Sequence, residues 1–150
     1  MCVMPGIVCA IRGGPSSRPT IDRSITLAQE TSEIIYFLYV VNLDFLSRTA
    51  SSRVQAISQE MHQMGEFILL SAQKAAEAAG VKAEGIVRHG KVGPEITNLC
   101  HELSATYLVL GLPEARGEEN AFNLEMIQQF REEIEEATGT RVIFTQEPAE

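Results

Sequence analysis

The sequence predicts an α/β fold in which a doubly wound, mostly parallel sheet of five strands carries helices on both faces. Apolar runs of strand length alternate with amphipathic segments of helix length along the 150 residues, and parallel strands need such crossover helices. Several runs are continuously apolar, which is typical of strands covered on both faces. A chain of this length buries enough surface for one core, so we expect a single domain over residues 1–150.

The N-terminal elements are separated by a glycine-containing loop. The apolar run 7–11 predicts the first strand, and the loop 12–17 follows it. Thr20 is the candidate N-cap of a first helix that ends near Ser32, with Asp22 favourably placed in its first turn. A strand, a glycine turn and a helix start therefore follow one another directly.

The middle of the chain predicts two strands and a long helix. The run 34–41 is continuously apolar and rich in β-branched and aromatic residues, as in a central strand. Apolar residues then recur every three or four positions between the capping serines, Ser51 and Ser52, and Gly80, which predicts one long amphipathic helix. The strand expected at 81–88 carries interrupting residues that suit a sheet edge, namely Lys82, Glu84 and Gly85.

A short helix, a buried strand and a turn come next. Pro94 stands at the first position expected for the helix. The apolar run 107–110 predicts the strand, which ends in Gly111. The following segment, 112–120, is turn-like because it holds proline, glycine and several charged residues.

The C-terminal part predicts a last helix and a last strand. A helical stripe of apolar residues runs from 124 to 137 and is closed by Gly139. The strand is expected at 141–145. Residues 146–150 are polar with a proline, so we expect a frayed tail.

Composition argues against several classes of partner. The chain has 12 Lys and Arg against 20 Asp and Glu, a formal charge of −8, which repels nucleic acid and anionic lipid. The three cysteines, Cys2, Cys9 and Cys100, match no zinc or haem spacing and favour a reducing cytoplasm. The N-terminal residues lack the pattern of a signal peptide, and no apolar stretch approaches the ~20 residues of a membrane span.

The loop after the first strand is the main candidate for ligand binding. Its glycines let a ligand approach the backbone, and the helix start supplies unpaired N–H groups that favour an anion. Its spacing matches neither GxGxxG nor GxxxxGK[ST], so a structural turn with nothing bound remains the alternative. Arg18 adds a second cation to the loop. The candidate ligand-binding residues are Arg12, Gly13, Gly14, Ser16, Ser17, Val40 and Gly111.

No catalytic or metal site is predicted. His62, His89 and His101 are dispersed over two helices and a strand end, without the spacing of metal ligands. Cys100 and His101 are adjacent on a helix, so their side chains point about 100° apart and do not form a nucleophile–base pair. We expect no metal and no cofactor.

Segments matching a known family occur in order along nearly the whole chain. They are 7–11 with Gly13 just after it, 37–41, 74–81, and 93–96 running on to 108–111. On these segments the chain resembles the universal stress protein family. The resemblance implies a sheet of strand order 3-2-1-4-5, a homodimer commonly formed through the last strand, and, in one branch, an adenine-nucleotide site.

This chain departs from the nucleotide-binding branch at two places. That branch has an aspartate after the first strand, where this chain has Arg12, and a signature GxxG followed by nine residues and G[ST]. Gly111 matches the first signature glycine, but Glu114 stands at the second, and no Gly-Ser or Gly-Thr pair follows. Pro113 also removes a backbone donor. We therefore expect that ATP is not bound in the family manner.

Three functions stay open from the sequence. The first is a non-enzymatic cytoplasmic regulatory or binding protein of the universal stress type with an altered pocket. The second is an adenine-nucleotide binder, of AMP or ATP, with slow hydrolysis, in which Arg12 replaces the missing aspartate's contacts. The third is an accessory domain that docks on a larger protein such as a transporter. A small anion near Arg12 is a further candidate ligand.

The last strand is the candidate homodimer interface. It has no internal charge or proline, so its free N–H and C=O groups favour antiparallel pairing with a second copy across a two-fold axis. The candidate interface residues are Arg141, Val142, Ile143, Phe144 and Thr145.

Overall fold

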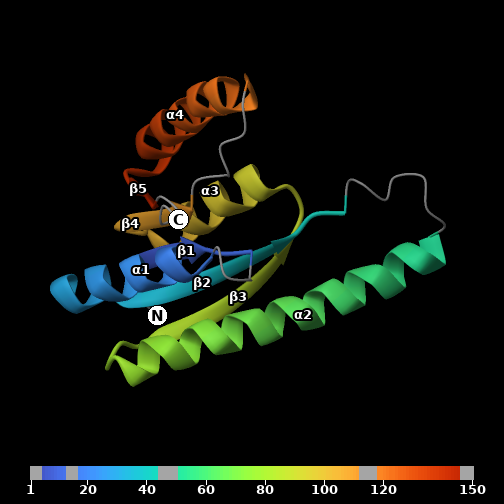
Figure 1. Ribbon diagram of the computed structural model, residues 1–150, viewed down its shortest axis with the longest axis horizontal. Helices are drawn as coiled ribbons and strands as arrows, with labels where there is room; N and C mark the ends of the chain where they lie inside the picture. The colour runs from blue at the N-terminus through green and yellow to red at the C-terminus, as the bar shows by residue number, and fades with distance from the viewer. Residues whose placement is uncertain (1–4, 13–16, 44–50, 112–117, 146–150) are drawn as a thin grey trace.

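The computed structural model describes residues 5–12, 17–43, 51–111 and 118–145. Five parallel strands form one sheet in the order β3-β2-β1-β4-β5, and four helices connect them (Figure 1). The elements are β1 Gly6–Ala10, α1 Arg18–Thr31, β2 Ile34–Val41, α2 Ser51–Ala78, β3 Ala83–His89, α3 Val92–Leu103, β4 Tyr107–Gly111, α4 Glu118–Thr138 and β5 Arg141–Thr145. The predicted fold class and strand order are confirmed.

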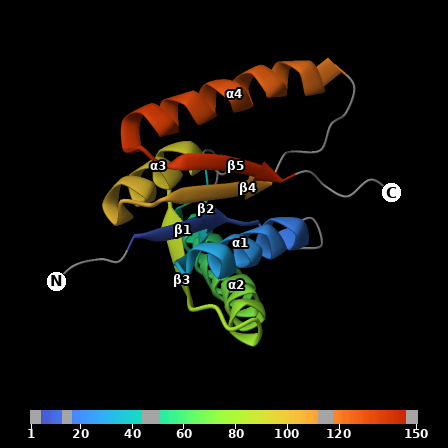
Figure 2. The same ribbon diagram turned by 90° about the vertical axis from the view of Figure 1, so that its left-hand side faces the viewer.

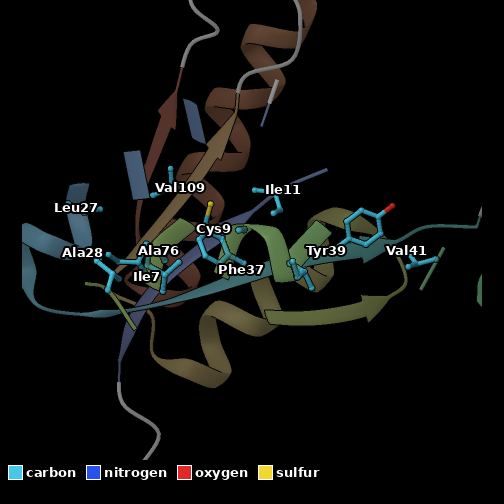
Figure 3. Close-up of a cluster of buried hydrophobic side chains, with 14 residues drawn as sticks. Ile7, Cys9, Ile11, Leu27, Ala28, Phe37, Tyr39, Val41, Ala76 and Val109 are labelled. Carbon is cyan, nitrogen blue, oxygen red and sulfur yellow. The ribbon is translucent and has the colours of Figure 1, made fainter. Parts of the chain in front are cut away.

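The sheet is covered on both faces, as the continuous apolar runs predict. On one face, α1 and α2 pack against side chains that include Ile7, Cys9 and Phe37 (Figure 3). On the other face, α3 and α4 pack against a second cluster that includes Val8 and Leu108. All five of these side chains are fully buried, because successive residues of a strand point to opposite faces and here both faces are interior.

The start of α1 differs from the prediction. The N-cap is Ser17, not Thr20, and its side chain makes no capping hydrogen bond. Pro19 lies in the first turn, where a missing N–H costs nothing. Asp22 consequently lies beyond the first turn and forms an exposed ion pair with Arg18, at 3.8 Å from Nε to Oδ1.

Other boundaries shift by a few residues. The strand expected at 81–88 is β3, which begins at Ala83 and ends at His89. Pro94 is the third residue of α3 rather than the first, since the helix begins at Val92. The segment expected to be turn-like to residue 120 is already helical from Glu118. The tail 146–150 lies outside the described residues.

The described helices include no segment long and apolar enough to cross a lipid bilayer.

Candidate functional site

The candidate site lies at the carboxyl ends of β1 and β4. The strand order reverses between these two strands, and open parallel sheets bind ligands at such a switch point. Arg12 follows β1 by two residues, and Gly111 is the last residue of β4. The first residues of α1 lie above the same edge, because α1 packs on β1, β4 and β5.

The loop residues that the structure describes differ in exposure. Arg12 is exposed, and no carboxylate among the described residues pairs with it. Ser17, at the start of α1, is 7 % exposed. Gly13, Gly14 and Ser16 lie outside the described residues. An unpaired guanidinium in solvent is therefore the charged group that the described part of the loop offers to a ligand.

Two threonines join α1 to the ends of β4 and β5. Thr20 Oγ1 lies 2.9 Å from Thr145 Oγ1, and either hydroxyl is able to donate. The Thr145 hydroxyl also reaches the carbonyl oxygen of Leu110 at 3.4 Å. Thr20 is 2 % exposed, so its hydroxyl is a buried polar group that needs this partner.

Gly111 is required at this junction for packing. A Cβ added there would lie 2.9 Å from Thr20 Oγ1, closer than real Cβ atoms come to other atoms. The space above the Gly111 backbone is thus occupied by the Thr20 hydroxyl. A glycine that looks like part of a ligand signature serves here to let α1 approach β4.

Val40 lies near the end of β2, the strand beside β1 on the side away from β4. The register pairs Ala10 of β1 with Leu38, and the Ile11 N–H continues this pairing by donating to the Leu38 carbonyl at 2.9 Å. Val40 is therefore about level with Arg12 on the neighbouring strand. Its half-buried side chain packs against the α3 side of the sheet.

The two described cysteines are not nucleophiles. Cys9 and Cys100 are both free and buried. Burial raises the pKa of each thiol to about 12, so both stay protonated at neutral pH, whereas the thiolate is the reactive form. His101 is exposed while Cys100 is buried, so the two neighbouring side chains point to different surroundings.

Two of the three histidines meet, which the sequence analysis missed. His62 Nδ1 lies 2.9 Å from His89 Nε2, and the rings stack with their planes 13° apart. The lengths of the two elements account for this contact. The helix from His62 to Ala78 is about 24 Å long, and the strand from Ala83 to His89 runs back beside it for about 20 Å, so the two histidines come to the same level. Within the described part of the chain, no three His, Cys, Asp or Glu side chains cluster closely enough to hold a metal ion.

Arg88, beside His89, is committed to structural ion pairs. Its guanidinium donates to both carboxylate oxygens of Glu102, at 3.1 and 2.6 Å, and approaches Glu95 at 3.7 Å. The hydrogen bonds from Arg88 hold the pKa of Glu102 below its usual value. Arg88 thus fastens the end of β3 to α3 and is not offered to a ligand.

The outer edge of β5 is less open than the sequence predicts. The Val142 N–H donates to Glu135 Oε2 at 3.0 Å, so the expectation that the N–H groups of this edge are free is wrong at Val142. Glu135 belongs to α4, which packs on β5. Ile143 and Phe144 are half-buried on opposite faces of the sheet, and the Arg131 guanidinium lies 4.9 Å from the Phe144 ring centroid.

Comparisons with known proteins agree with this architecture. The family model described as "Universal stress protein family" matches residues 5–141. A comparison with curated protein sequences found no match.

Solved structures give the same fold at low identity. Universal stress protein UspA from Lactobacillus plantarum is 10% identical, with a TM-score of 0.74 over 96% of this chain and 98% of that one. The universal stress protein from Archaeoglobus fulgidus in complex with dAMP is 16% identical, with a TM-score of 0.60 over 96% and 98%. A universal stress protein family protein from Arabidopsis thaliana with AMP bound is 17% identical, with a TM-score of 0.56 over 97% and 93%.

The contact between Gly111 and Thr20 predicts the effect of a methyl group. Gly111→Ala is expected to lower the free energy of unfolding by about 1–3 kcal/mol, the usual cost of overpacking, as measured by urea denaturation. In the double variant with Thr20→Ala the clash is removed, so its loss is expected to be smaller than the sum of the two single losses.

Gly93→Ala is the matched control. A Cβ there meets Phe130 at an ordinary 3.7 Å, and alanine is the better residue inside a helix, so no loss is expected. Strictly additive losses at Gly111 and Thr20 would contradict the packing role of Gly111.

Proposed function

This chain belongs to the universal stress protein family, and we propose from that premise that it is a non-enzymatic regulatory protein with an altered ligand pocket. The pocket takes a small phosphorylated ligand, an adenine mononucleotide or inorganic phosphate, at Arg12. It does not take Mg-ATP in the manner of the family's nucleotide-binding branch. The two buried free thiols suit work in a reducing compartment such as the cytoplasm.

The observation that carries the proposal is the Thr20 hydroxyl above Gly111. A signature glycine helps to bind phosphate because its bare backbone allows a close approach. Here the Thr20 hydroxyl lies only 2.9 Å from the position that a Cβ of residue 111 would take, and its contact with Thr145 holds it there. A ligand phosphate is therefore denied the close approach at Gly111.

Charge supports the same distinction between ligands. Arg12 replaces the family's aspartate with a donor that forms charge-assisted bonds to phosphate oxygens. A mononucleotide presents one phosphate group, which a single guanidinium matches. A triphosphate adds further negative charge, and the sequence after Gly111 holds Glu114; a carboxylate close to a phosphate costs on the order of 1 kcal/mol at protein-like dielectric.

The named relatives favour an adenine mononucleotide over bare phosphate. Among the similar structures, one is a complex with dAMP and another has AMP bound, and a third universal stress protein is a complex with cAMP. Val40, level with Arg12 at the end of β2, offers an apolar surface on which a base is able to rest.

The first prediction concerns the choice between nucleotides. Calorimetric titration is expected to show AMP binding and no Mg-ATP binding at tens of micromolar ligand, because the pocket lacks the family's phosphate cradle. A submicromolar dissociation constant for Mg-ATP would sink the proposal, and release of ADP on incubation would revive the alternative of slow hydrolysis.

Arg12 is expected to be responsible for the affinity. AMP and phosphate are expected to raise the melting temperature of the parent, since a ligand that binds only the folded state stabilises it. Arg12→Ala should abolish the rise. Arg23→Ala, which removes an exposed arginine of α1, is the control and should respond like the parent; equal responses from all three proteins would place the site elsewhere.

We also propose a homodimer through β5, as the family resemblance implies. With the Val142 N–H already bonded to Glu135, pairing is expected to centre on Phe144, whose N–H is the next to face outward by strand alternation. Phe144→Pro removes that N–H without touching the bonds to β4, and should give a monomer in analytical ultracentrifugation.

Phe144→Ala is the matched control for the dimer. Both substitutions remove the aromatic ring, and only the proline removes the N–H, so the alanine variant should stay dimeric. If the parent is a monomer at tens of micromolar, or if the two variants have the same mass, pairing through β5 is refuted.

A further inference from the structure

The outward face of α2 carries an exposed stripe centred on Phe67. Phe67 is 70% exposed, with Met64 at 57% and Leu70 at 48% beside it. Three large apolar side chains are thus exposed together on one face of a helix. Contiguous apolar patches of this kind often mark a site where another molecule binds. The stripe is defined as the nine exposed residues from 56 to 78 that lie within about 60° of Phe67 on a regular helix, namely Ala56, Glu60, Gln63, Met64, Phe67, Leu70, Ser71, Lys74 and Ala78. The exposed Arg53 continues the same face one turn earlier.

The stripe is self-complementary about its centre. Residues equally far before and after Phe67 match in kind: Ala56 with Ala78, Glu60 with Lys74, Gln63 with Ser71, and Met64 with Leu70. Two antiparallel copies related by a two-fold axis at Phe67 bring exactly these residues opposite one another, because an isologous interface pairs i with j and j with i. The two alanines then meet each other, the polar Gln63 meets Ser71, and each charge meets its opposite.

We propose that the α2 stripe is an interface with a second copy of this chain, with the two helices antiparallel and Phe67 on the two-fold axis. The spacing of Glu60, Met64, Phe67, Ser71 and Lys74 alternates four and three, as in helices that pack at a shallow angle. Phe67 and its copy form the centre, flanked on each side by Met64 and Leu70. Glu60 and Lys74 close the two ends with opposite charges.

Charge explains why the second copy is the fitting occupant. The chain carries −8 overall, so most of its surface repels a second copy. Between residues 56 and 78 the stripe holds one glutamate and one lysine and is neutral, and Arg53, one turn before it, adds a positive charge. Its geometry also leaves the other proposed interface free, since α2 packs on β2 and β3, at the opposite end of the sheet from β5 (Figure 2).

The size of the stripe sets the concentration range for a test. From Ala56 to Ala78 the face is about 33 Å long and about 10 Å wide, a footprint well below the about 800 Å² per partner of a standard interface. Association is therefore expected to be weak. Sedimentation of the full chain from about 10 to 500 micromolar covers the range from micromolar to submillimolar affinity.

Phe67→Lys tests the centre of the interface. It places two like charges together on the axis and should weaken the α2 association at least tenfold, while circular dichroism stays unchanged because Phe67 is exposed. Val92→Lys is the matched control, as Val92 is an exposed apolar residue on α3 away from the stripe, and should sediment like the parent.

A charge exchange tests the antiparallel register. Glu60→Lys alone and Lys74→Glu alone each set like charges opposite one another and should weaken association. The double variant restores opposite charges at both ends and should recover the parent's affinity. In a parallel arrangement every variant, like the parent, would set like charges opposite one another, so the single variants would not weaken association.

The α2 and β5 interfaces are separable. Phe144→Pro should be a monomer at about 10 micromolar and should still associate through α2 toward about 500 micromolar. A parent that uses both interfaces should exceed the mass of a dimer at the higher concentration. If Phe67→Lys sediments like the parent over the whole range, or if the double charge exchange is as weak as its single variants, the stripe is not an interface between copies and the proposal is overturned.

Discussion

The position of β1 between β2 and β4 is the constraint on which the rest of the structure depends. β1 is the strand where the order reverses, and Ile7, Val8 and Cys9 are fully buried because both faces are covered. With β1 fixed, Arg12 follows it at the edge of the sheet where β4 ends in Gly111. The start of α1 must then cross that edge, and the contact of Thr20 with Thr145 and Gly111 follows.

Most of the fold is predictable from the sequence, because the patterns that indicate strands and helices are local. Continuous apolar runs such as β2 predict central strands, and the strand order followed from the family resemblance. The cap of α1 was misplaced for a physical reason: a threonine near a helix start is equally suited to capping or to a tertiary hydrogen bond. Only the fold brings Thr145, 125 residues away along the chain, to the Thr20 hydroxyl.

The features that the sequence analysis missed all depend on side chains from distant segments. His62 and His89 meet because α2 and β3 run back along one another for similar lengths. Glu135 bonds the Val142 N–H because α4 lies over β5, which no strand pattern reveals. Gly111 fits a ligand signature by position, and its packing role is visible only once Thr20 is seen above it.

Our central proposal is that the site at Arg12 takes a mononucleotide and not Mg-ATP. An NMR titration that follows the backbone amide signals tests this residue by residue. With AMP, the signals of Arg12 and Ser17 should shift with saturation while those of the distant α2 stripe stay in place, and Mg-ATP should move neither set at the same concentrations. Saturating shifts at Arg12 and Ser17 with Mg-ATP at lower concentrations than with AMP would contradict the account.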